Sequence, residues 1–265
     1  MNNLGGASQL RVTNYNQILP IIEIYPCLQG EGSRRGHPCF AIRTTGCTHR
    51  CYFGEQGDWC DTWYSSIHAQ KGKFSFYDII QMIESSPNIK EIMFTGGAPT
   101  MHPAIINEIM HLAYQRNFFL TLETEGSHFI KTEHPIHLIS LSPKFNNSIP
   151  KLGILTPKGK KVDQKFIDQH NKYRLNLYAM RQMIDYHQDY QLKPVCDGSH
   201  ENIQEINSLI AELNIPRSKV YLMPAGRTRK EIIKAYPKII ELALKEGFKF
   251  TGRDHIIAFD DKIGV

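Results

Sequence analysis

The chain has 265 residues, of which 41% are hydrophobic and 22% are charged, a composition that is ordinary for a globular enzyme. Its formal charge of +5 is spread along the sequence, and the densest basic run, residues 158–161, has no interleaved aromatic residues, which argues against a nucleic-acid groove. No apolar run approaches the roughly 20 residues of a membrane helix, and residues 1–10 lack the pattern of a signal peptide.

Along the chain, apolar runs that fit strands alternate with segments whose apolar spacing fits helices. The predicted strands are residues 18–25, 39–44, 91–95, 119–123, 137–142, 191–196, 219–223 and 248–251. The predicted helices are residues 76–85, 103–116, 171–187, 203–213 and 229–246. This alternation predicts an α/β fold with a parallel sheet and crossover helices, closed or partly closed into a barrel. Since neither a repeat nor a linker interrupts it, we expect one domain over residues 1–265.

Residues 144–169 fit neither pattern, because asparagine, proline and lysine dominate them. We expect an irregular excursion over the surface there. Functional loops of such folds follow the carboxyl ends of the strands. A cysteine-rich loop, residues 46–62, follows the strand predicted at 39–44, and a Gly-Gly-Ala-Pro loop, residues 96–99, follows the strand at 91–95. Both loops should therefore open onto the same face.

Three of the six cysteines, Cys47, Cys51 and Cys60, lie in the cysteine-rich loop. Their clustering indicates a metal site and a reducing compartment, so we expect a cytoplasmic protein. Three thiols on one loop can bind three corners of a cubane iron–sulfur cluster, and the fourth iron then has no protein ligand. The pattern predicts a 4Fe–4S cluster with one open iron.

Two other interpretations of these thiols remain open. A structural zinc site has four ligands, typically as two close pairs, and the fourth would have to come from His49, Cys39 or a distant residue. Alternatively the thiols bind no metal, as buried cysteines often do not. We expect Cys27, Cys39 and Cys196 to be core residues that bind no metal, because they lie in or beside strand-like runs.

The Cys-x-x-x-Cys pair, the third cysteine after Trp59 and the Gly-Gly-x-Pro loop resemble the radical S-adenosylmethionine superfamily. In that superfamily the open iron binds the amino and carboxylate groups of S-adenosylmethionine, and an electron from the cluster releases a 5′-deoxyadenosyl radical. Two features depart from the pattern. Eight residues separate Cys51 from Cys60, where two are usual. Ala98 replaces the usual glutamate, for which Glu123 and Glu125 are possible substitutes.

Shorter stretches are similar to one family of that superfamily, 7-carboxy-7-deazaguanine synthase. They are residues 28–32, 41–47, 59–62, 123–126, 141–144 and 253–257. The resemblance implies an incomplete β/α barrel that converts 6-carboxy-5,6,7,8-tetrahydropterin to 7-carboxy-7-deazaguanine with loss of ammonia, a step of queuosine and deazapurine biosynthesis. It also implies a Mg²⁺ ion near the substrate carboxylate, a reducing protein such as a flavodoxin or ferredoxin, and a homodimer.

By this resemblance the residues expected to bind substrate are Gln29, Gly30, Glu31, Arg43, Gly97 and His255. A carboxylate such as Glu31 can accept two parallel N–H bonds from the pterin, although it could also be a solvated turn acid. The guanidinium of Arg43 fits a substrate carboxylate bidentately, with a structural salt bridge as the alternative. His255 could donate to the substrate or be a core residue.

The residues expected to bind S-adenosylmethionine are Trp59, Gly96, Gly97, Pro99, Glu123, Thr124, Glu125, Ser142 and Lys144. The two glycines let the backbone approach a ligand closely, and the proline fixes the turn. Ser142 and Lys144 could contact the ribose or carboxylate, or only each other. Thr62 is expected to ligate Mg²⁺, which prefers oxygen ligands, with a buried loop hydroxyl as the alternative. No catalytic side chain is expected beyond the cofactor-borne radical.

Two rival functions remain at this point. A glycyl-radical activase would use the same cluster on a protein partner. A zinc-binding interaction protein would use the thiols without catalysis.

Overall fold

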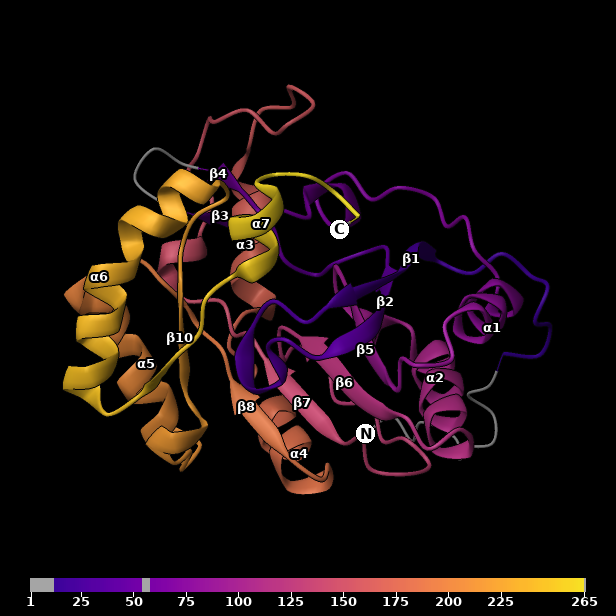
Figure 1. Ribbon diagram of the computed structural model, residues 1–265. Helices are drawn as coiled ribbons and strands as arrows, with labels where there is room; N and C mark the ends of the chain where they lie inside the picture. Colours follow the sequence, from indigo (N-terminus) through magenta and orange to yellow (C-terminus); the bar gives the residue numbers. More distant parts are fainter. Residues whose placement is uncertain (1–11, 54–57, 265) are drawn as a thin grey trace.

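The computed structural model describes residues 12–53 and 58–264 (Figure 1). Residues 1–11, 54–57 and 265 lie outside the described residues. The prediction that residues 1–10 lack a signal peptide therefore concerns residues that the structure does not describe. The same is true of the middle of the insert between Cys51 and Cys60.

Two curved sheets follow one another in an arc. The first has the strand order β1-β2-β5-β6-β7-β8, formed by β1 (Ile21–Leu28), β2 (Pro38–Thr44), β5 (Glu91–Gly96), β6 (Phe119–Thr124), β7 (Leu138–Leu141) and β8 (Tyr190–Leu192). The second has the order β11-β10-β9, formed by β9 (Val195–Cys196), β10 (Tyr221–Pro224) and β11 (Lys249–Phe250). A parallel bridge between Leu192 and Val220 joins the sheets. Among the described residues β1 and β11 do not pair, so the arc is an incomplete β/α barrel, which confirms the predicted fold class.

The strand predicted at 18–25 differs from the structure in position and direction. β1 begins and ends three residues later, and it pairs antiparallel with β2, Cys27 lying opposite Cys39. The short connection from residue 29 to 37 explains this, because a parallel pair needs a crossover of a dozen or more residues. The other pairings in the two sheets are parallel, as expected. Two very short strands, β3 (Tyr52–Phe53) and β4 (Asp58–Trp59), pair within the cysteine-rich loop.

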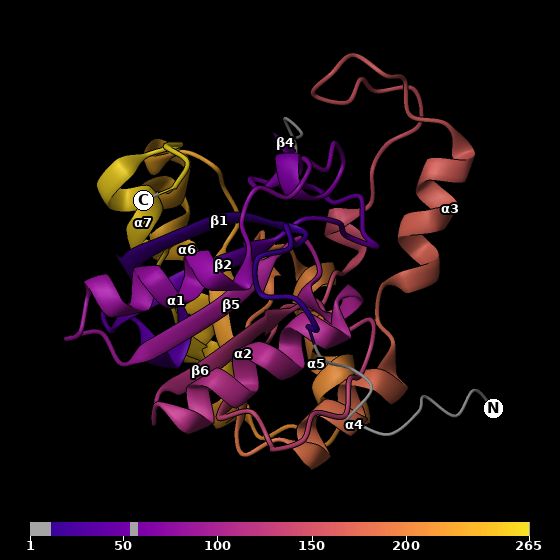
Figure 2. The same cartoon turned by 90° about the vertical axis from the view of Figure 1, so that its right-hand side faces the viewer.

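The described residues form seven α-helices. They are α1 (Phe76–Ser85), α2 (Pro103–Gln115), α3 (Gln164–Tyr173), α4 (Leu177–Tyr186), α5 (His200–Glu212), α6 (Arg229–Glu246) and α7 (Asp254–Phe259). The 3-10 turns are Gly32–Arg34, Trp63–Ser65, Pro99–Met101, Asn146–Ser148 and Arg217–Lys219. Figure 2 shows α1 and α2 crossing the face of β5 and β6. Likewise α4 contacts β7, and α6 contacts β10 and β11.

Local sequence explains the predicted helices that match. Ser75 and Asp78 form a capping box that starts α1, and the helix buries Phe76, Ile79 and Ile83 on one face. Gly247, with φ of 68°, ends α6 in the left-handed conformation that favours glycine. The bounds of α1 and α6 are those predicted from apolar spacing.

The region from 144 to 187 was predicted less well. A helix was expected over residues 171–187, but Leu175 has φ of 56° and divides the segment into α3 and α4. Asp163 caps α3 and Asn176 caps α4, so each helix has its own start signal. The predicted excursion is irregular only up to Asp163, and residues 149–163 project from the body in Figures 1 and 2. The strand predicted at 191–196 is also two strands, β8 and β9, in different sheets.

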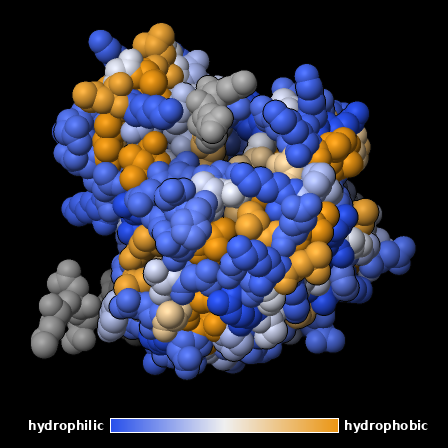
Figure 3. All heavy atoms as spheres, turned by 90° about the vertical axis from the view of Figure 1, so that its left-hand side faces the viewer, coloured by the Kyte–Doolittle hydropathy of each residue, from blue (hydrophilic) through white to orange (hydrophobic). Residues whose placement is uncertain are grey.

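The core lies between the sheets and the helices, with fully buried side chains such as Phe40, Phe94, Ile109 and Ile139. Figure 3 shows the face opposite to that of Figure 2, which is mostly hydrophilic with separate apolar patches. In the part of the chain that the structure describes, every helix is too short or too polar to cross a membrane.

Candidate active site

A cavity of about 900 Å³ opens at the carboxyl ends of the parallel strands, where such folds place their ligands. Its walls include Gly96 and Gly97 after β5, Thr124 at the end of β6, and Ser142 after β7. The predicted meeting of the cysteine-rich loop and the glycine loop at one face is confirmed. This size is ample for a nucleotide-sized cofactor together with a small substrate.

Cys47, Cys51 and Cys60 all line this cavity. The loop holds them together through its backbone, since the amide of Cys60 donates to the carbonyl of Cys51 at 3.1 Å. The sulfur of Cys47 accepts from the amide of His49 at 3.3 Å. Burial, with a smaller contribution from the carboxylate of Glu125, raises the pKa of the Cys47 thiol to about 12. A thiol that is costly to ionise in this apolar setting becomes a thiolate readily when it binds iron, because the metal replaces the proton.

A single metal ion and an iron–sulfur cluster require different spacings of these three thiols. Among residues 12–53 and 58–264, no three His, Cys, Asp or Glu side chains gather as the ligands of one metal ion. Zinc would need its sulfur ligands within about 2.3 Å of one centre, whereas a cubane distributes three thiolates over three iron atoms. Nε2 of His49 is buried without a hydrogen-bond partner inside the same loop, a polar atom left for a bound group.

The glycine loop touches the cysteine-rich loop directly. Gly96 has φ of 156°, a backbone conformation that side chains rarely adopt, and a Cβ at Gly97 would lie 2.3 Å from the carbonyl oxygen of Gly46. Ala98 is fully buried and outside the cavity wall, and Pro99 is buried beside it. The loop therefore offers backbone to the cavity, and its third position offers no side chain.

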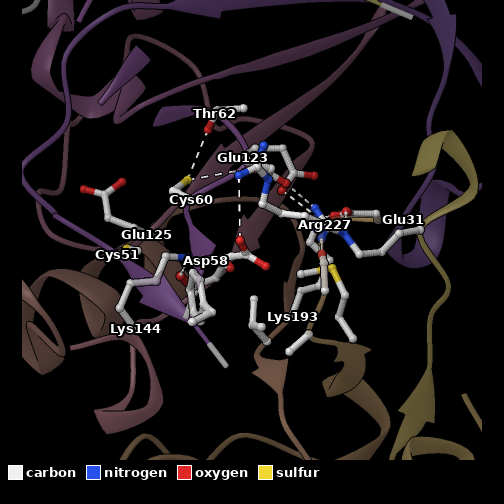
Figure 4. Close-up of a pocket in the computed structure, with 18 of the residues that line it drawn as sticks. Glu31, Cys51, Asp58, Cys60, Thr62, Glu123, Glu125, Lys144, Lys193 and Arg227 are labelled. Atoms are coloured by element: carbon white, nitrogen blue, oxygen red, sulfur yellow. Dashed lines mark hydrogen bonds and ion pairs between the residues drawn. The ribbon is translucent and has the colours of Figure 1, made fainter. Parts of the chain in front are cut away.

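Acidic and basic side chains follow at the ends of β6 and β7. Glu125, 5% exposed, accepts from the hydroxyl of Thr48 in the cysteine-rich loop at 3.3 Å. Lys144 donates to the carbonyl and hydroxyl oxygens of Ser142 at 2.6 and 2.9 Å. In Figure 4 the cavity thus has Cys51, Glu125 and Lys144 on one side of the view and Glu31 on the other, with Cys60 between them.

Glu31 lies in a chain of alternating charges. Its Oε2 accepts from Nζ of Lys193 at 2.8 Å, and its Oε1 accepts from Nε of Arg253 at 2.9 Å. Lys193 also donates to Glu123 at 2.9 Å, and Arg253 also pairs with Asp61. Burial alone would raise the pKa of Glu31, but the two cations hold the pKa well below its usual range, which favours the ionised carboxylate.

The remaining residues predicted to bind substrate surround Glu31 or lie farther along β2. Gln29 is 1% exposed and donates to the hydroxyl of Thr121 at 3.2 Å. Gly30 leaves room for His255, since a Cβ there would lie 2.4 Å from Nδ1 of that ring. Burial lowers the pKa of His255, which favours the neutral ring.

Arg43 lines the cavity from the carboxyl end of β2, where it lies opposite Glu23 of β1. Its Nε donates to Glu23 at 2.5 Å, and the hydroxyl of Tyr64 donates to the same carboxylate at 3.2 Å. The salt bridge considered as an alternative is therefore present. The salt bridge engages Nε, the hydroxyl of Tyr25 also interacts with the guanidinium, and the guanidinium has further N–H groups.

Trp59 and Thr62 belong to the cysteine-rich loop. The indole of Trp59 is 7% exposed and donates to the carbonyl of Leu155 at 2.9 Å, which ties the loop to the projecting segment. The hydroxyl of Thr62 lies 3.3 Å from the sulfur of Cys60, and both line the cavity (Figure 4).

Lys193 and Arg253 were missed as site residues. The signal for Lys193 was a lysine inside the apolar run 191–196, where an unpaired charge is costly. Arg253 stood in the C-terminal stretch 253–257 that carried the resemblance, two residues before His255. Neither partner could be found from the sequence, because Glu31 lies more than 150 residues away from both.

No family model matches the chain, but curated proteins do. The 7-carboxy-7-deazaguanine synthase of Halobacterium salinarum is 32% identical over 249 residues, which are 92% of this chain and 91% of that protein. The 7-carboxy-7-deazaguanine synthase of Rhodopirellula baltica is 30% identical over 247 residues, 93% of this chain and 89% of that protein. The crystal structure of QueE from Escherichia coli has the same fold, with a TM-score of 0.56 and 21% identity, covering 88% of this chain and 92% of that chain.

Proposed function

This chain belongs to the 7-carboxy-7-deazaguanine synthase family, and we propose that it forms 7-carboxy-7-deazaguanine from 6-carboxy-5,6,7,8-tetrahydropterin with loss of ammonia. It is then a radical S-adenosylmethionine lyase of queuosine and deazapurine biosynthesis. The observation that carries the proposal is one cavity of about 900 Å³ that is lined both by the three thiols and by a cation-paired glutamate. A cofactor and a pterin can occupy it together.

Cys47, Cys51 and Cys60 would hold a 4Fe–4S cluster, which with S-adenosylmethionine supplies the radical that starts the rearrangement. The exposed backbone of Gly96 and Gly97 would receive the methionine part of the cofactor, since no side chain blocks it. Ser142 and Lys144 offer a hydroxyl and an ammonium at the same mouth.

The residues around Glu31 orient the substrate. Each oxygen of Glu31 accepts one bond from a protein cation and has a further lone pair for an N–H of the aminopyrimidine ring. Arg43 would bind the substrate carboxylate with the N–H groups that its salt bridge to Glu23 leaves over. Because these groups are buried and fixed, the pterin is held in the cavity that the thiols also line, and water is excluded from the reacting carbon.

Three finer points rest on the family resemblance. Thr62 would contribute an oxygen ligand to Mg²⁺ near the substrate carboxylate, and its place beside Cys60 in the cavity wall is compatible with that role. A reducing protein such as a flavodoxin or ferredoxin would deliver the electron. The active form would be a homodimer.

The test is turnover under anaerobic conditions. Protein reconstituted with iron and sulfide receives S-adenosylmethionine, a reductant, Mg²⁺ and the carboxytetrahydropterin, and ammonia and the deazaguanine chromophore are followed. We expect equal amounts of both. Formation of deoxyadenosine without deazaguanine would show that the substrate assignment is wrong. Activity on a protein with a glycyl-radical site would favour the glycyl-radical activase.

A further inference from the structure

The ammonium of Lys193 is 3% exposed and lies between two carboxylates, 2.8 Å from Glu31 and 2.9 Å from Glu123. A buried ammonium is expensive unless it is fully paired, and here the pairing is complete enough to raise the pKa of Lys193 although burial alone would lower it. Such a group contributes little net stability compared with an apolar side chain of the same size. Its place in the cavity wall suggests a different role.

The backbone at Lys193 is fixed from both sides. Its amide donates to the carbonyl of Leu141 in β7 at 2.7 Å, and the carbonyl of the next residue, Pro194, accepts from Met223 in β10 at 3.2 Å. Lys193 therefore stands where the six-stranded sheet ends and the three-stranded sheet begins. A side chain mounted on two strands is a rigid support.

Glu31, by contrast, lies in the loop between β1 and β2. Arg253, from the segment before α7, holds only its Oε1 and is shared with Asp61, and Nε2 of His255 lies 3.8 Å from the same oxygen, beyond hydrogen-bond distance. A single bond from a shared partner leaves the carboxylate free to rotate. The second bond, from Lys193 to Oε2, fixes the plane of the carboxylate and therefore the direction of its remaining lone pairs.

We propose that Lys193 is a positioning residue for substrate, which acts by holding Glu31 in the orientation that receives the aminopyrimidine edge of the pterin. Glu123 completes the arrangement by holding the ammonium from the end of β6. The inference rests on the proposed function, because it assigns Glu31 to the pterin.

Binding without turnover tests the proposal. The reconstituted protein is titrated anaerobically with the carboxytetrahydropterin by calorimetry, with S-adenosylmethionine and Mg²⁺ present and no reductant. Lys193→Met keeps the length of the side chain and removes its charge. It should raise the dissociation constant for the pterin on the order of 10- to 100-fold. Lys193→Arg should recover part of the loss. Lys219→Met serves as the matched control, because Lys219 pairs with Asp189 at an exposed site and the dissociation constant should stay unchanged.

The decisive comparison places Lys193→Met in a Glu31→Gln background. If Lys193 acts through Glu31, the second substitution should change the dissociation constant less than about threefold there. Should Lys193→Met fold poorly, the double variant Lys193→Met with Glu123→Gln restores the charge balance and should still bind weakly. Iron content and melting temperature show which variants are intact.

Two results would overturn the inference and leave the proposed function intact. In the first, Lys193→Met binds the pterin as tightly as the parent protein. In the second, the losses of binding free energy caused by Lys193→Met and by Glu31→Gln add up in the double variant. A parent protein that binds S-adenosylmethionine but no tetrahydropterin would overturn the proposed function as well. The outcomes are therefore distinguishable.

Discussion

The amide of Ala98 donates to the carbonyl oxygen of Gly46 at 2.8 Å, so the glycine loop and the cysteine-rich loop are joined through backbone alone. The contact is close, because a Cβ on the preceding Gly97 would lie 2.3 Å from the Gly46 oxygen and 2.7 Å from the Ser65 oxygen. The glycine loop therefore packs directly against the start of the cysteine-rich loop.

Gly97→Ala should separate the two loops. Both atoms that the new methyl meets belong to backbone, so the loops must move, and we expect a loss of about 1–3 kcal/mol in stability with at least tenfold weaker S-adenosylmethionine binding. Gly36→Ala is the control, since a methyl there meets nothing within 4 Å although φ is 86°. It should cost stability of about 1–2 kcal/mol without changing cofactor binding. If Gly97→Ala bound S-adenosylmethionine as tightly as the parent protein, the close contact between the two loops would not matter for cofactor binding, and this prediction would be wrong.

Ala98→Glu should destabilise the protein, although the superfamily pattern that the sequence resembles has glutamate here. Ala98 is fully buried and lies outside the cavity wall, so a carboxylate there is removed from water without a partner. We expect a lower melting temperature than for Ala98→Gln, which adds similar volume without charge. Tighter S-adenosylmethionine binding with unchanged stability would show instead that the position faces the cofactor.

Cys51→Ala should abolish the cluster, because only two of the three thiols remain. Iron and sulfide per chain after anaerobic reconstitution measure this directly. Cys39→Ala is the matched control, since Cys39 is fully buried in β2 and was the cysteine considered as a fourth zinc ligand. It should retain full iron content, and loss of metal in Cys39→Ala would point to a four-ligand site.

His187 should make the protein less stable in mild acid. Burial lowers its pKa to about 4 from 6.5, while its Nδ1 accepts from the amide of Ile136 at 3.0 Å. Below pH 6.5 the imidazole of His187 is protonated in the unfolded chain, whereas in the folded protein it stays neutral down to about pH 4. The free energy of unfolding therefore falls as the pH drops through this window.

In His187→Asn, which keeps a neutral acceptor, the fall in unfolding free energy between pH 7 and pH 5 should shrink by about 2 kcal/mol. Urea unfolding at the two pH values measures the difference. An unchanged pH dependence would show that His187 does not titrate with folding.

The residues whose placement together was predicted from sequence are those that lie near one another in the chain or on adjacent strands. Cys47, Cys51 and Cys60 share one loop, and the glycine loop follows the adjacent strand of a parallel sheet, so spacing and topology were sufficient to place them together. The same holds for α1 and α6, each with a capping box and an apolar stripe.

The parts that were missed depend on distant pairing. Lys193 and Glu31 are 162 residues apart, and nothing local indicates that a lysine in an apolar run will meet a loop glutamate. The division of α3 from α4 depends on a positive φ at Leu175, a residue type that gives no turn signal. The direction of β1 followed from the length of its connection to β2, which was available in the sequence but was outweighed by the βα alternation.

The electron paramagnetic resonance spectrum of the reduced protein, recorded before and after S-adenosylmethionine is added, probes the open iron most directly. Three cysteine ligands predict about four irons per chain and a spectrum that changes when the cofactor binds. One zinc per chain without iron, or a cluster signal that the cofactor leaves untouched, would contradict the account.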